Sequence, residues 1–163
     1  MAQIKLKTGR IIADYGDPYI VAEVNSSHNG SVEVARQMID AAADAGCNCV
    51  KFQSWSAESL YSTSYYKENP ISKRIVTKFS LSPEELKGLA EYCREKGVDY
   101  CSTPYSREEV DFLLDECGAP FVKIASRAFL FACDASLTYQ YLESTVHVEL
   151  GLSILPPRFL ATK

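Results

Sequence analysis

Strand-like and helix-like segments alternate along most of this chain, from residue 19 to residue 126. Short apolar runs rich in β-branched and aromatic residues predict strands at 19–25, 47–53, 98–103 and 120–126. The segments between them carry apolar residues at every third or fourth position, which predicts helices. Strands that alternate with helices form parallel βα units with right-handed crossovers. The sequence therefore predicts an α/β fold, either a doubly wound sheet or a (β/α)8 barrel.

The predicted helices have clear start and stop signals. The first covers 31–45, and the next two begin at Ser82 and Ser106. Glu85 and Glu109 stand three residues after those serines and complete two capping boxes. A glycine ends each helix: Gly46, Gly97 and Gly118.

One face of each predicted strand becomes polar toward its carboxyl end. The residues concerned are Glu23, Asn25, Lys51, Gln53, Thr103 and Lys123, with Ser102 and Ser126 nearby. A barrel requires this pattern, because its outer face meets apolar helices and its active site lies at the carboxyl ends of the strands. No G-x-G-x-x-G or P-loop follows any strand, which argues against a nucleotide site. We therefore expect a TIM-type barrel, represented here by about its first four βα units.

The converging polar residues predict a site for an anion. Lys51 and Lys123, with the hydroxyl and amide groups around them, suit a phosphate or a carboxylate. Glu23 could serve as general acid or base, or neutralise one lysine. A different interpretation makes Lys123 a Schiff-base nucleophile, which requires a pKa lowered by burial or by Lys51.

Composition narrows the function further. The formal net charge is −4 and the basic residues form no cluster, so we expect no nucleic-acid partner. No apolar run reaches the ~18 residues of a membrane span, and the N-terminus lacks the apolar core of a signal peptide, so we expect a cytoplasmic protein without a membrane partner. The chain has six cysteines and two histidines without zinc-site spacing, which predicts reduced core thiols and no metal site in this chain.

Four motifs carry a family resemblance: "AEVNSSHNG", "VKFQ", "STP" and "KIAS", in this order. Over about 11–126 the chain resembles the N-terminal part of the sialic acid (N-acetylneuraminate) synthases, including their legionaminic and pseudaminic acid relatives. The resemblance implies a (β/α)8 barrel that condenses phosphoenolpyruvate with an N-acylmannosamine-type sugar and releases phosphate. It also implies a divalent metal, Mn or Mg.

The resemblance also assigns roles to individual residues. By it, phosphoenolpyruvate is held by Lys51, Thr103, Lys123 and Ser126, and Gln53 contacts the sugar. Glu23 and His28 take catalytic positions, and Asn29 belongs to the substrate-binding loop motif. Ser27 stands where the family usually has Asn, which leaves that one contact without its usual side chain.

The family pattern stops after Ser126, which divides the chain into a barrel part, 1–126, and a divergent tail, 127–163. A complete barrel takes roughly 250 residues, so we expect a truncated chain that is weakly active or inactive, with the metal ligands absent. Open strand edges predict marginal stability or self-association, including homo-oligomers. The alternatives are a non-catalytic anion- or sugar-binding remnant, a partner subunit, or an aldolase-like half-barrel. The stretch 54–80, with Tyr61, Tyr65 and Tyr66, is either a lid over the site or a surface excursion.

Overall fold

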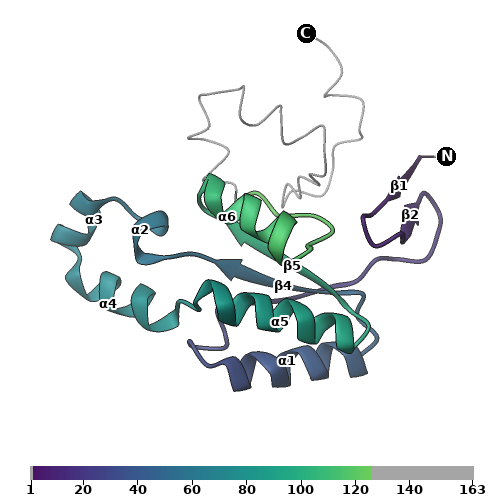
Figure 1. Cartoon of the computed structure of the whole chain (residues 1–163), viewed down its shortest axis with the longest axis horizontal. Coiled ribbons are helices and arrows are strands. Elements are labelled where there is room, and N and C mark those ends of the chain that lie inside the picture. Colours follow the sequence, from purple (N-terminus) through teal and green to yellow (C-terminus); the bar gives the residue numbers. More distant parts are fainter. Residues whose placement is uncertain (1, 126–163) are drawn as a thin grey trace, which may run out of the picture.

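A computed structural model describes residues 2–125 and shows a parallel sheet at their centre. Its strands are β3 (Val21–Asn25), β4 (Cys49–Ser54) and β5 (Asp99–Pro104), in the order β3-β4-β5. Neighbouring strands run parallel, so the parallel βα units predicted from the alternation are confirmed (Figure 1). The fold is α/β with a parallel sheet, and the closed eight-stranded barrel stays a prediction.

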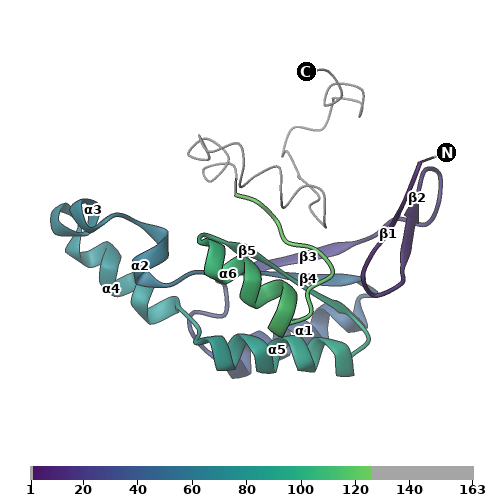
Figure 2. The ribbon, with the colours of Figure 1, turned by 45° about the horizontal axis from the view of Figure 1, so that its top comes forward.

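Two helices cover one face of this sheet (Figures 1 and 2). They are α1 (Val32–Asp44) and α5 (Pro83–Glu95), and they contribute apolar stripes to the main core. Ile39, Leu89, Val50 and Phe52 are fully buried within that core. Each helix starts where the sequence predicts, because Ser31 caps α1 and Ser82 forms a capping box with Glu85 at α5.

A third helical segment follows β5. Helix α6 (Arg107–Asp111) starts with the predicted Ser106 and Glu109 capping box and continues into the π-helical turn η1 (Phe112–Glu116). Leu113 of this turn is fully buried in the core. None of the helices in residues 2–125 is long and apolar enough to cross a membrane.

The stretch 54–80 forms an arm of helices that the sequence periodicity did not reveal. Its members are α2 (Ala57–Leu60), α3 (Thr63–Glu68) and α4 (Pro70–Phe79). The arm extends outward beyond the carboxyl end of β4 (Figures 1 and 2). Tyr61 and Tyr65 stack at a ring-centroid distance of 4.4 Å and pack edge-on against Tyr66.

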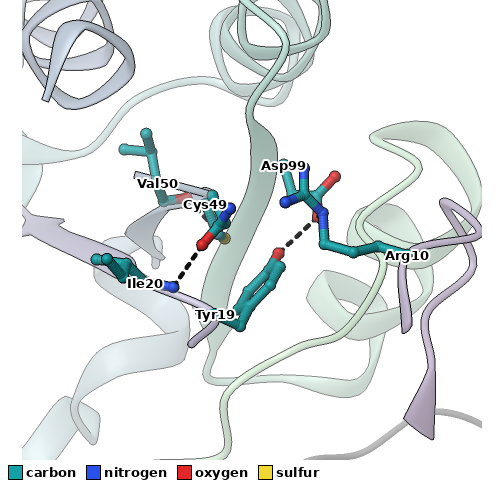
Figure 3. Close-up of polar contacts among 7 residues, drawn as sticks. Arg10, Tyr19, Ile20, Cys49, Val50 and Asp99 are labelled. Atoms are coloured by element: carbon teal, nitrogen blue, oxygen red, sulfur yellow. Dashed lines mark hydrogen bonds and ion pairs between the residues drawn. The ribbon is translucent and has the colours of Figure 1, made fainter. Parts of the chain in front are cut away.

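An N-terminal hairpin lies at the opposite end of the sheet, where the strands begin (Figure 2). It consists of β1 (Gln3–Lys5) and β2 (Ile11–Ala13), paired antiparallel. The Tyr19 hydroxyl donates a 2.5 Å hydrogen bond to Asp99, whose carboxylate lies 3.9 Å from Arg10 Nε (Figure 3). Burial, together with the Asp99 carboxylate, raises the pKa of Tyr19 and keeps it a neutral donor. These contacts tie the hairpin to the beginning of β5.

The prediction of a strand at 120–126 is wrong. Within the described residues, this segment does not form a regular strand. The segment forms a single bridge at Val122, and the Lys123 amide donates to the Ser102 carbonyl at 3.0 Å. It therefore runs beside β5 without the repeating backbone bonds that define a strand, since its other edge meets no described strand. Ser126 and the proposed tail 127–163 lie outside the described residues.

Candidate functional site

Glu23 and Lys51 stand side by side on adjacent strands. They are register partners across β3 and β4, and Lys51 pairs in turn with Cys101 on β5. The Lys51 ammonium donates a hydrogen bond to the Glu23 carboxylate and forms an ion pair with it. The Lys51 side chain is only 4% exposed, whereas that of Glu23 is 52% exposed. The pair thus has one buried cation and one carboxylate that reaches solvent.

The lysines hold Glu23 in its charged form. The hydrogen bond and charge of Lys51 lower the pKa of Glu23, although partial burial opposes this effect. Asn25 and the positive charge of Lys123 lower it further. The charge of Lys123 thus acts on Glu23, and Lys51 contacts it directly.

Thr103 adds an unpaired hydroxyl to this end of the sheet. It is the register partner of Gln53, and its side chain is 1% exposed. No described residue hydrogen-bonds its Oγ1. Because a buried hydroxyl without a partner costs free energy, this group is suited to a ligand oxygen or a water molecule.

Asn25 occupies a kink that the sequence pattern missed. The register of β3 against β4 shifts after Glu23, so that Asn25 pairs with Phe52. Asn25 has a φ of +48°, a left-handed conformation that Asn tolerates better than most residues. Strict alternation would place Asn25 beside Gln53, whereas the irregular register places it beside Phe52.

His28 belongs to the loop after β3, and its side chain is buried. Its side chain packs on Phe52 at a centroid distance of 6.1 Å, and its Nδ1 accepts a 3.1 Å hydrogen bond from the Gly30 amide. Burial lowers the pKa of His28, so the imidazole is neutral with its proton on Nε2. This hydrogen bond caps the loop, and the catalytic role of His28 stays a prediction. Asn29 is exposed on the same loop, with a φ of +52°.

Ser102 faces the helices and not the lysines. It pairs with Phe52 in register, and its hydroxyl lies 2.6 Å from that of Ser54 on the same side of the sheet. Ser102 therefore lies near the charged cluster, next to Thr103 on β5, but does not face it. The reason is the two-residue alternation of the strand, which turns Thr103 to one face and Ser102 to the other.

A divalent metal has no fitting ligand set in residues 2–125. No cluster of three or more His, Cys, Asp or Glu side chains there could hold a metal ion. The donors at the charged cluster are one carboxylate and two ammonium groups, which repel a cation.

Comparisons with known proteins agree on one family. A family model described as the NeuB family matches residues 38–153, a span that continues past Ser126. An N,N'-diacetyllegionaminic acid synthase of Campylobacter jejuni is 34% identical over 116 residues, which cover 66% of this chain and 34% of that enzyme. An N-acetylneuraminate-9-phosphate synthase of Drosophila melanogaster is 32% identical over 116 residues, or 66% of this chain and 31% of the enzyme.

A solved structure has the same fold over most of the chain. It is an N-acetylneuraminic acid (sialic acid) synthetase from Leptospira borgpetersenii, 29% identical, with a TM-score of 0.68. The match covers 83% of this chain and 44% of that one. The chain spans about a third of the length of the curated relatives that it matches.

Proposed function

The chain belongs to the NeuB family, and from this membership we propose that it forms one wall of the active site of a nonulosonic (sialic) acid synthase. The reaction joins phosphoenolpyruvate to an N-acylmannosamine-type sugar, consumes one water and releases inorganic phosphate. Relatives that carry the names of legionaminic acid and N-acetylneuraminate-9-phosphate synthases support this choice of chemistry. The proposed parent fold is a (β/α)8 barrel of which the described sheet is one part.

The cluster of Glu23, Lys51 and Lys123 is the observation that carries the proposal. Phosphoenolpyruvate bears a phosphate and a carboxylate, and the cluster, in which Lys51 is shared with Glu23, carries one net positive charge that attracts these anionic groups. The unpaired Thr103 hydroxyl supplies a hydrogen bond to the same ligand. Ser126 is proposed as a further contact and lies outside the described residues.

Glu23 is proposed to act as a carboxylate and not as an acid. Its lowered pKa leaves it ionised at neutral pH, so it can accept a proton during the condensation or hold Lys51 in place before substrate binds. Gln53 is partly buried next to Thr103 and is proposed to contact the sugar. Asn29, exposed on the loop after β3, is proposed to approach the same substrate.

Because the chain spans about a third of its relatives, the groups that would complete the sugar pocket and hold a Mn or Mg ion are not among the described residues. We propose that the chain by itself binds phosphoenolpyruvate but turns it over weakly or not at all. On this basis a role as an anion-binding remnant or partner subunit is the second candidate.

An activity assay on this exact chain separates the candidates. Phosphate release from phosphoenolpyruvate should be followed with N-acetylmannosamine and manganese, with either substrate omitted as a control. Release that requires both substrates supports catalysis by the chain, and binding without release supports the second candidate. Borohydride reduction in the presence of pyruvate tests the Schiff-base alternative, which requires a covalent adduct on Lys123.

A further inference from the structure

We propose that a cationic pocket on helix α4 binds a small phosphate monoester. The pocket has a volume of about 510 Å³ and is lined by Tyr66, Pro70, Lys73, Arg74, Thr77 and Lys78. Small-molecule sites typically have volumes of ~300–1,000 Å³, so there is room for a metabolite-sized ligand. The inference concerns the helical arm and does not depend on the function proposed for Glu23 and Lys51.

The charges lining the pocket are all positive. Lys73, Arg74 and Lys78 belong to it, and no acidic residue does. None of the ion pairs found within residues 2–125 involves these three cations. Arg74 and Lys78 stand four positions apart on one helix, where like charges repel and destabilise the helix. A bound dianion would relieve this repulsion.

The pocket also has features that orient a phosphate ester. Lys73 Nζ lies 5.8 Å from the centre of the Tyr66 ring, a cation–π contact that restrains the ammonium. Tyr66 is 8% exposed and gives the pocket a rigid apolar wall. Thr77 stands one turn after Lys73 and offers a hydroxyl. Arg74 can form paired hydrogen bonds with two phosphate oxygens.

The arm contacts the loop of the candidate site. A Cβ atom placed on Gly30 would come within 2.2 Å of the Lys78 carbonyl oxygen, so the last turn of α4 packs directly on the loop that holds His28. A ligand that restrains α4 therefore acts on a helix in direct contact with this loop.

A titration of the full chain with glycerol 3-phosphate tests the proposal. Amide ¹H–¹⁵N spectra should show saturable shifts for residues 66–78, and glycerol at the same concentration should leave them unchanged. The double variant R74Q/K78Q should weaken binding at least tenfold. The matched control K67Q removes an exposed charge from the neighbouring helix α3, outside the pocket, and should change the affinity less than twofold.

The same titration in Lys51→Met separates this pocket from the site proposed for phosphoenolpyruvate. Retention of the α4 shifts in this variant supports an independent pocket, whether or not phosphoenolpyruvate binds elsewhere. The proposal is overturned if no saturable shift occurs on α4. It is equally overturned if K67Q weakens binding as much as R74Q/K78Q. The ligand would then be attracted by the general positive charge of the arm and not by this pocket.

Discussion

Lys51 is buried on β4, and its ammonium pairs with the half-exposed carboxylate of Glu23 on β3. A charged group in a strand interior requires a partner, because an unpaired buried charge is strongly unfavourable. The pairing accounts for the acid that interrupts an otherwise apolar strand. It also leaves the outer side of the carboxylate open to solvent, where a substrate can approach.

Replacing Lys51 should change the titration of Glu23. In Lys51→Met the pKa of Glu23 should rise toward the ordinary glutamate value of about 4.3, because its main hydrogen bond and charge partner is lost. Carboxyl ¹³C chemical shifts measured against pH report this change directly. Lys87→Met, at an exposed ion pair with Glu116, is the control and should leave Glu23 unchanged.

The ion pair also predicts a pH dependence of stability. Since the folded-state pKa of Glu23 is lowered, its contribution is complete above the unfolded-state value of about 4.3 and is lost as pH falls through the lower folded-state value. The difference in unfolding free energy between the native chain and Glu23→Gln should therefore shrink as pH falls below about 4. Urea unfolding between pH 6 and 3 measures it, and a constant difference would contradict the assignment.

The contact between Gly30 and Lys78 predicts a steric penalty. Gly30 and Gly46 have φ values of +80° and +78°, so alanine is comparably strained at both positions. Only at Gly30 would the added Cβ meet backbone, 2.2 Å from the Lys78 carbonyl oxygen, whereas nothing lies within 4 Å at Gly46. Gly46→Ala should lower the free energy of unfolding by about 1 kcal/mol, and Gly30→Ala should lower it clearly more. If urea unfolding showed equal losses of stability in the two variants, the contact between Gly30 and α4 would be contradicted.

The capping box at the start of α5 predicts a smaller loss of stability than that expected for Gly30→Ala. Ser82 accepts a hydrogen bond from the Glu85 amide, and the Glu85 carboxylate accepts one from the Ser82 amide at 2.7 Å. Ser82→Ala should destabilise the chain by about 1 kcal/mol, as measured by urea unfolding. Thr63→Ala is the control on an exposed position of α3 and should have little effect.

Local signals in the sequence were enough to predict some of these features. The capping boxes at Ser82 and Ser106 are local, because each links residues three positions apart. The pairing of Glu23 with Lys51 could be predicted because side chains alternate regularly between the two faces of parallel strands. These predictions needed no knowledge of long-range packing.

Other features depend on tertiary structure and could not be read from a pattern. The register shift before Asn25 breaks the alternation, and it depends on how β3 pairs with β4. The placement of His28 against Phe52 depends on the path of the loop between β3 and α1. The helices of the arm are short, and the periodicity of 54–80 is too brief to identify them, although Ser56 and Ser62 do cap two of them.

The edges of the sheet predict self-association. Strand β3 pairs only with β4 within residues 2–125, so its outer edge is open to another strand. We expect the sedimentation coefficient of the full chain to increase with concentration in analytical ultracentrifugation. A constant monomer mass together with a sharp cooperative melt would contradict this expectation.

Binding of phosphoenolpyruvate to the full chain tests the central claim most directly. Calorimetric titration should show saturable binding to the native chain and at least a tenfold loss of affinity in both Lys51→Met and Lys123→Met, because each removes a cation proposed to hold the ligand. Lys87→Met should bind as the native chain does. Undiminished binding in the Lys51 and Lys123 variants, or no binding to the native chain, would contradict the account.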